Sequence, residues 1–258
     1  MQRPIAYEVA TLERRELSLV HGIVVHAAAV VDGRLLEFNE RWSRRSRSAE
    51  RSLSSWDASV WMAVCFAIGS VVFIVAGISA IVGPGAEATT VRLGNLIGAT
   101  VFSVGALFAV EEARCAVEPR RWSQFWASIA GRASLIQGVA ALLPFQVGMV
   151  IAMANTEQAH LVAALNTVGS LGFVLASYLY LRESWPAHDV GTTSSAANLL
   201  GSVLFLVGST AGFAPPGAAA DAVVNWSFLV GSMLFAVGAI TALVELSAPA
   251  RSTEVVGG

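Results

Sequence analysis

The sequence contains no lysine, only two cysteines and few charged residues of any kind. All sixteen cationic side chains are arginine. Asp, Glu, Lys and Arg together make up 13% of the 258 residues, whereas an average soluble domain contains about 25%. Hydrophobic residues make up 55%, and the mean hydropathy is +0.64. This composition excludes an ordinary soluble protein and predicts an integral membrane protein, for which the lipid bilayer is the first expected partner.

The scarcity of reactive side chains also excludes several kinds of chemistry. Cys65 lies in an apolar run and Cys115 in an Arg- and Glu-rich loop, so the pair indicates neither a disulfide framework nor a Cys-based metal site. His21 and His26 are five residues apart, which on a helix puts them on different faces. The apolar runs offer no nucleophile with a base and no paired titratable groups. We therefore expect no enzyme, no cofactor and no bound metal.

Six long apolar segments dominate the sequence after residue 55. A spanning helix needs about 20 apolar residues, because its backbone groups must bond internally in hydrocarbon. None of the six segments contains Asp, Glu, Lys, Arg or His. They predict an all-α fold, a polytopic six-helix transmembrane bundle. The segments run from Ala58 to Val82, Leu93 to Val110, Ala133 to Met153, Leu161 to Leu181, Ala196 to Ala214 and Ala222 to Val244.

The distribution of arginine predicts the orientation of the bundle. Cationic residues in short loops are retained on the cytoplasmic side of a membrane. With six spans, fifteen arginines fall on one side and only Arg92 falls on the other. Because topology explains this clustering of arginine, we expect no nucleic-acid partner. We expect a multi-pass protein of the bacterial inner membrane, with both termini in the cytoplasm.

Residues 1–55 form a short cytoplasmic arm before the first span. Residues 17–31 are apolar but too few for a span, so they predict a cytoplasmic or interfacial helix that ends at Asp32-Gly33. The Arg-rich segment 41–47 follows. It has two interpretations, a stop-transfer flank or a surface that binds anionic lipid headgroups. A membrane-protein partner or a second copy of the chain would be further partners.

A short pattern recurs along the spans. In five of the six, a Gly is followed four residues later by Phe, and a second pair of small residues follows seven residues after the first. Small residues on one face let helices pack closely in lipid. The third span departs from the pattern, with Gly138 and Leu142 in place of the Gly and the Phe. The glycines predicted to pack against other helices are Gly69, Gly98, Gly169, Gly201, Gly208, Gly231 and Gly238.

An acid stands ten residues beyond the Phe of each even-numbered span, at Glu112, Glu183 and Glu245. This regularity groups the spans into three related helical hairpins. The acids have two interpretations: ion pairs with neighbours such as Arg114 and Arg182, or an acidic ring that attracts cations or carries protons. The predicted boundaries are the arm 1–55, hairpins 56–112, 133–183 and 195–245, cytoplasmic loops 113–132 and 184–194, and a tail 246–258.

The third span contains polar residues and a proline at membrane depth. Gln137 and Gln146 lie nine residues apart with Pro144 between them. Proline removes a backbone hydrogen bond and bends a helix. Broken helices line the substrate sites of transporters, but glutamine also bonds across neighbouring helices. A structural role and a solute site therefore both remain open.

The last two spans resemble a known family. They contain Gly201-Ser202, Phe205 and Gly208-Ser209, followed by Gly231-Ser232, Phe235 and Gly238. These motifs are similar to those of the YrhK-like domain family, whose members are built on a two-helix membrane hairpin. The resemblance implies no activity and no catalytic residues.

Function divides into two classes. A structural, interaction or accessory membrane protein explains the small-residue faces and the minimal loops. A small-solute or ion transporter would use the third span and the three Glu. We favour the first, because coupled transporters keep ionisable groups within the membrane.

Overall fold

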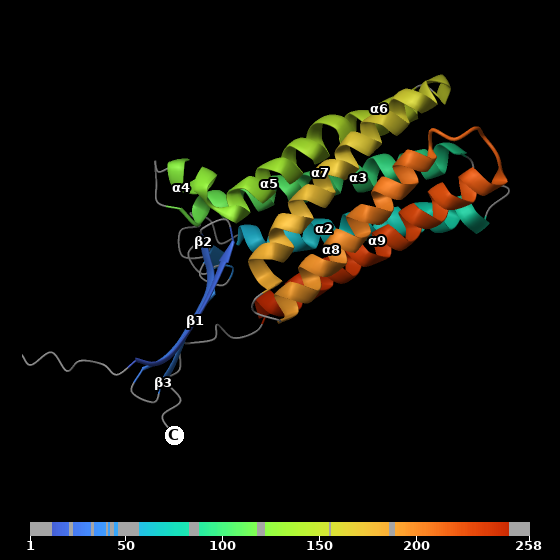
Figure 1. Cartoon of the computed structure of the whole chain (residues 1–258). Coiled ribbons are helices and arrows are strands. Elements are labelled where there is room, and N and C mark those ends of the chain that lie inside the picture. Colours follow the sequence, from blue (N-terminus) through green and yellow to red (C-terminus); the bar gives the residue numbers. More distant parts are fainter. Residues whose placement is uncertain are drawn as a thin grey trace, which may run out of the picture.

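The computed structural model describes residues 12–20, 23–31, 34–39, 41, 44–45, 57–82, 88–117, 122–154, 156–185 and 189–247. Six helical segments in it are long and apolar enough to cross a membrane (Figure 1), which confirms the predicted bundle. They are α2 (Ala58–Val82), α3 (Ala88–Cys115), a third span built from α5 (Ile129–Ala140), the π-helical turn η1 (Ala141–Phe145) and α6 (Gln146–Ala154), then α7 (Ala159–Ser184), α8 (Val190–Ala211) and α9 (Ala218–Ser247). Two short helices, α4 (Trp122–Ala127) and η2 (Thr156–Gln158), lie in the connections.

Side-chain caps mark several helix starts. Asp57 accepts a hydrogen bond from the Ser59 amide at 2.8 Å, and Asp189 accepts one from the Thr192 amide at 3.1 Å. Ser128 Oγ accepts from the Gly131 amide at 2.9 Å at the start of α5. Such caps satisfy amide groups that have no partner inside the helix. They fix where α2, α5 and α8 begin.

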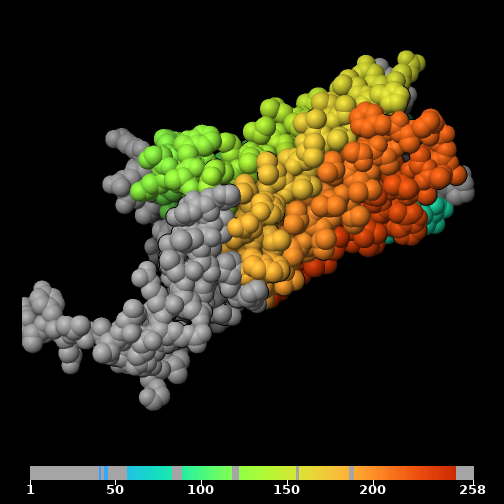
Figure 2. Space-filling model, in the orientation of Figure 1, coloured from blue at the N-terminus to red at the C-terminus, as the bar shows by residue number. Residues whose placement is uncertain are grey.

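The six spans form a closed ring in chain order. Each span packs against the spans before and after it, and α9 packs against α2. On the face seen in Figure 2, the side chains of α7 and α8 form one continuous surface. Large apolar side chains such as Val75, Leu171 and Ile240 are exposed on the outside of the ring. In a protein of this composition, that outer surface is the one that faces lipid.

One phenylalanine from each span meets the others inside the ring. Neighbouring rings of this group have centroids 5.1 to 6.2 Å apart, mostly edge to face. Each of the six side chains is at most 6% exposed. The Phe layer, as we call this group, therefore fills the centre of the ring. It consists of Phe73, Phe102, Phe145, Phe173, Phe205 and Phe235.

The glycines of the recurring pattern lie against neighbouring helices. A Cβ added to Gly231 would lie 2.7 Å from the Phe205 ring and 3.1 Å from the Gly201 carbonyl oxygen. Gly98 meets the ring of Phe73 in the same way. Close backbone approach is what small residues permit in a membrane bundle. The others meet the following groups: Gly69 the backbone of α3, Gly169 Phe145, Gly201 the Gly231 carbonyl, Gly208 Ser227, and Gly238 the Asn198 amide.

The third span supplies its phenylalanine through an irregular turn. The sequence pattern puts Leu142 at the position of the Phe, but Leu142 is exposed and Phe145 is buried in the Phe layer. Pro144 has no amide hydrogen and its ring crowds the preceding turn. The helix widens into a π turn here, and the Gln146 amide bonds to the Ala141 carbonyl. The extra residue in the turn changes the register and brings Phe145 to the centre.

The arm contains a sheet, so the cytoplasmic or interfacial helix predicted over residues 17–31 is wrong. Strands β1 (Leu12–Val20), β2 (Ile23–Val31) and β3 (Arg34–Asn39) form an antiparallel sheet in the order β1-β2-β3. Val20 pairs with Ile23, and Val31 pairs with Arg34. Segment 17–31 is rich in Val and Ile, which favour strands, and an Asp-Gly pair follows it, a common hairpin signal. That three hairpins of the bundle share one repeat stays a prediction.

Candidate functional site

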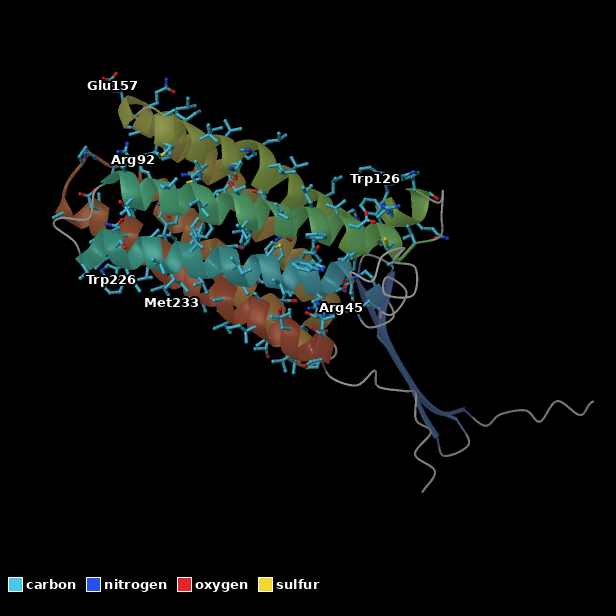
Figure 3. All side chains as sticks on the ribbon, turned by 180° about the vertical axis from the view of Figure 1, so that it is seen from behind. Arg45, Arg92, Trp126, Glu157, Trp226 and Met233 are labelled. Carbon is cyan, nitrogen blue, oxygen red and sulfur yellow. The ribbon has the colours of Figure 1, made fainter. Side chains whose placement is uncertain are left out.

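Three arginines of the arm are buried at one end of the bundle. Arg41, Arg44 and Arg45 are helical and are 5%, 4% and 8% exposed. Residues at i, i+3 and i+4 share one face of a helix. We call this end, where α3, α7 and α9 finish, the arm end. Figure 3 shows Arg45 and Trp126 there, and Arg92 and Trp226 at the opposite end.

The predicted acids lie at the same end, one from each of three spans. Glu112 near the end of α3 is 2% exposed, and Glu183 near the end of α7 is 1% exposed. The Glu245 side chain, near the end of α9, is 9% exposed. Each stands ten residues after a member of the Phe layer, about 15 Å along a helix. The structure therefore brings together the three acids that the sequence analysis singled out.

Two of the arginines bind carboxylates through two nitrogen atoms each. Arg41 Nε donates to Glu245 Oε1 at 2.9 Å, and Arg41 Nη2 donates to Glu245 Oε2 at 3.0 Å. Arg44 Nη2 donates to Glu183 Oε2 at 3.0 Å and Nε to Oε1 at 3.4 Å. Arg44 Nη1 also donates to Glu112. Paired donation of this kind is stronger and more directional than a single bond.

Helix α8 completes the pocket of Arg41. Ser195 Oγ accepts a hydrogen bond from Arg41 Nη1 at 3.3 Å. A Cβ on Gly191 would lie 2.9 Å from Arg41 Nε and 3.0 Å from Glu245 Oε1. Glycine at this position therefore leaves the room that the guanidinium group needs.

Arg45 is held less completely than the other two. Its Nη1 lies 2.7 Å from Glu245 Oε2, and its Nε lies 3.7 Å from Glu112 Oε1. Among the described residues, neither of these buried nitrogens has a partner in hydrogen-bonding geometry. Burial, and then the nearby charge of Arg41, lower the pKa of Arg45.

The remaining two guanidinium groups are stabilised in their charged form. Burial opposes the charge of Arg41, but the attraction and hydrogen bonds of Glu245 outweigh it and raise its pKa. Burial likewise opposes the charge of Arg44, and the attraction of Glu183 and Glu112 raises its pKa. We call the three arginines and three acids the Arg–Glu cluster. Its formal charges cancel.

The partners of the acids differ from those that the sequence suggested. Arg114 bonds to Glu111, with Nε to Oε2 at 2.7 Å, and Arg182 donates to the Tyr178 hydroxyl at 3.0 Å. The arm, which sequence reasoning treated separately from the spans, supplies the arginines instead. The signal that points to this pairing is the i, i+3, i+4 spacing of three arginines, matched by three acids at equivalent helix ends.

Burial also changes the interpretation of the Arg-rich segment 41–47. The segment is predicted to contact lipid headgroups or to act as a stop-transfer flank. The three described arginines are instead enclosed by protein, so in this arrangement they are not exposed to headgroups. Arg47 lies outside the described residues.

The polar residues of the third span lie in the wall of the ring. Gln146 Nε2 donates to Thr100 Oγ1 at 2.9 Å, and Ser103 Oγ donates to Gln146 Oε1 at 3.4 Å, so this amide joins α6 to α3. Gln137 is half-buried on α5, and Pro144 lies in the π turn beside the Phe layer. These contacts match the bridging role that glutamine has in membrane helices.

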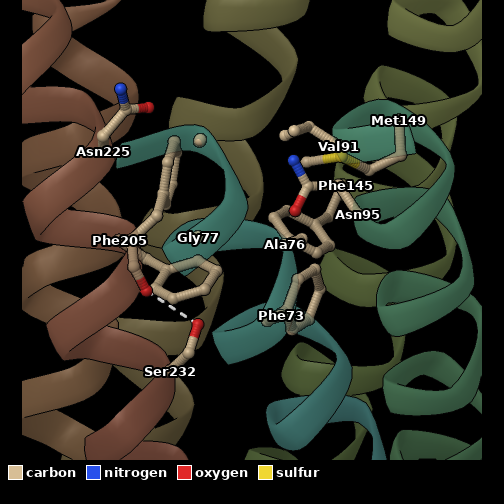
Figure 4. Close-up of a pocket in the computed structure, with 12 residues that line it drawn as sticks. Phe73, Ala76, Gly77, Val91, Asn95, Phe145, Met149, Phe205, Asn225 and Ser232 are labelled. Atoms are coloured by element: carbon tan, nitrogen blue, oxygen red, sulfur yellow. Dashed lines mark hydrogen bonds between the residues drawn. The ribbon is translucent and has the colours of Figure 1, made fainter. Parts of the chain in front are cut away.

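A small cavity lies against the Phe layer on the side away from the arm (Figure 4). Phe73, Phe145 and Phe205 line it together with Asn95 and Asn225. Its volume is about 50 Å³. That volume holds a few water molecules, whereas a cavity that binds benzene measures roughly 150 Å³. The cavity is therefore smaller than one that binds benzene.

The described residues contain no group of three or more His, Cys, Asp or Glu side chains that could hold a metal ion.

The comparisons with known proteins bear on the last hairpin. Residues 188–246 match the family model of the YrhK-like protein. The YrhK-like segment covers α8 and α9 as far as Leu246, which confirms the resemblance seen in the motifs. It supplies Gly191, Ser195 and Glu245, the groups around Arg41. The searches of curated proteins and of solved structures each returned no significant match.

Proposed function

We propose that this protein is a non-catalytic structural or interaction protein of the bacterial inner membrane. Its ring of six spans anchors the N-terminal arm at the cytoplasmic surface. The Arg–Glu cluster is the observation that carries the proposal, because arginines of the arm bind acids from α3, α7 and α9. Contacts with three separate spans hold this segment against the membrane domain.

The arm carries the surface that would meet a partner. The sheet order β1-β2-β3 makes β1 and β3 its edge strands. Edge strands present backbone groups that pair readily with another chain. Another membrane protein or a second copy of this chain would bind there, next to the membrane.

The interior of the ring favours this role over transport. The Phe layer fills the centre of the ring. The three acids that a transporter would use, Glu112, Glu183 and Glu245, form ion pairs with arginines of the arm. Gln146 is engaged with α3. No observation on the described residues favours the transport alternative.

A flux measurement tests the proposal. The full chain is reconstituted in proteoliposomes, and proton and cation flux are compared with empty vesicles. A variant with Pro144→Ala and Gln146→Leu, and another with Glu112→Gln, Glu183→Gln and Glu245→Gln, are measured beside the wild type. We expect wild-type flux at the level of empty vesicles. Wild-type flux that either variant abolishes without unfolding would contradict the proposed function.

A further inference from the structure

The Arg–Glu cluster lies at the end of the bundle where exposed tryptophans are found. Trp122 and Trp126 of α4 are 57% and 55% exposed, and Trp185, just after α7, is 55% exposed. Phe125 of α4 is 2% exposed and packs with Ala113 of α3 and Ala130 of α5, which holds α4 against the bundle. Figure 3 places Trp126 at the same end as Arg45. Tryptophan is enriched at membrane–water interfaces, so we expect headgroup phosphates close to this end of the bundle.

Two opposing contributions act on the docked arm. Buried ion pairs gain attraction, but they lose the hydration of both charges, and the two effects are of similar size. Arg45 is the least completely compensated of the three. It is 8% exposed and its Nη1 lies 2.7 Å from Glu245 Oε2, but neither Nη1 nor Nε has a partner in hydrogen-bonding geometry on the described residues. A second source of negative charge at the same depth would compete for these guanidinium groups.

Phosphate is the anion that suits the arginines of the arm. A guanidinium group presents paired N–H donors that match two oxygens of a phosphate as well as those of a carboxylate. Basic segments beside a membrane bind anionic lipid surfaces. We propose that anionic phospholipid headgroups compete with Glu112, Glu183 and Glu245 for the arm, so that the arm is a lipid-responsive latch.

The latch has two states. In a neutral bilayer the arm is docked, and the sheet is held at the arm end. In an anionic bilayer Arg41, Arg44 and Arg45 bind headgroups, the three acids are uncovered, and the sheet moves away from the bundle. This inference rests on the proposed function, because it describes how the presentation of the arm is regulated.

A distance measurement on the full chain tests the latch. Cys65→Ala and Cys115→Ser remove the native thiols, and Asn39→Cys at the end of β3 and Ser247→Cys at the end of α9 carry spin labels. The protein is reconstituted in phosphatidylcholine vesicles and in vesicles with about 40% phosphatidylglycerol. We expect one short distance in the neutral vesicles and a shift of most of the distribution to longer distances in the anionic ones. The same distribution in both lipids would overturn the proposal.

Two controls separate the lipid surface from other causes. Soluble inorganic phosphate and sodium chloride, each at an ionic strength of about 150 mM, are added to the neutral vesicles. Release of the arm by either salt to the extent caused by anionic lipid would overturn the assignment to headgroups. Arg92→Gln, at the opposite end of the bundle, should leave the lipid response unchanged, and Glu112→Gln with Glu183→Gln and Glu245→Gln should give the long distance in both lipids. The flux measurement tests the proposed function, and the spin-label distances test the latch. Failure of one proposal can therefore be distinguished from failure of the other.

Discussion

Individual side chains of the Arg–Glu cluster differ from their neighbours mainly in burial. Glu111 and Glu112 are adjacent on α3, yet Glu111 forms an exposed pair with Arg114, and Glu112 is 2% exposed against Arg44 and Arg45. An exposed ion pair contributes about 0 to 1 kcal/mol. Removing one partner of a buried pair costs about 3 to 5 kcal/mol, because the other charge is left buried and uncompensated.

Glu112→Gln should therefore lower the free energy of unfolding by about 3 kcal/mol or more, and Glu111→Gln by less than about 1 kcal/mol. Denaturant titration of both variants in detergent, followed by circular dichroism, checks this difference. Equal effects of the two substitutions would show that Glu112 is not in the buried cluster.

The glycines provide a second test at the scale of single residues. Gly231→Ala places a methyl group 2.7 Å from the Phe205 ring, and overpacking of this kind costs about 1 to 3 kcal/mol. Gly217 has nothing within 4 Å of an added Cβ, so Gly217→Ala is the matched control and should be neutral. Thermal unfolding of the two variants distinguishes them, and an unaffected Gly231→Ala would refute the close contact between α8 and α9.

At the scale of elements, the sequence identifies the spans well but not their irregularities. Length and lack of charge are sufficient to locate six membrane helices. The recurring pattern assumes regular α-helical spacing, and it therefore selects Leu142 where the π turn brings in Phe145. The strands of the arm differ from the prediction for another reason: length alone favours a helix over segment 17–31, whereas its Val and Ile content favours strands.

The π turn makes a testable distinction within the third span. Phe145→Ala removes a ring that is 1% exposed in the Phe layer, and such truncations cost about 3 to 5 kcal/mol. Leu142→Ala changes a side chain that is 37% exposed on the outer surface and should cost less than about 1 kcal/mol. Unfolding measurements on the two variants check the register, and the reverse order of effects would favour the regular helix.

At the scale of the whole molecule, the orientation of the ring is a prediction from arginine counts. An impermeant thiol label applied to intact cells should reach a cysteine placed at Gly217 and should not reach one placed at Gly258. The native cysteines are replaced in both variants, and permeabilised cells show that each site can react. Labelling of the Gly258 variant in intact cells would reverse the orientation and place the arm outside.

Contacts between distant parts of the chain are what the sequence could not predict. Arg44 and Glu183 are 139 positions apart, and Arg41 and Glu245 are 204 apart. Hydropathy and local spacing contain no information about which acid meets which base across such separations. The sequence did single out all three acids, because each stands at the same place in its hairpin, but it assigned them nearby partners.

The docking of the arm on the bundle is tested most directly by a double-mutant cycle on Arg44 and Glu183. The free energies of unfolding of the wild type, Arg44→Gln, Glu183→Gln and the double variant are measured in neutral lipid. Distant residues that do not touch have additive effects, and contacting residues show coupling of about 0.5 to 3 kcal/mol. We predict that the double variant is less destabilised than the sum of the single variants by an amount in this range. Additive effects would show that the arm does not bind the bundle through this pair.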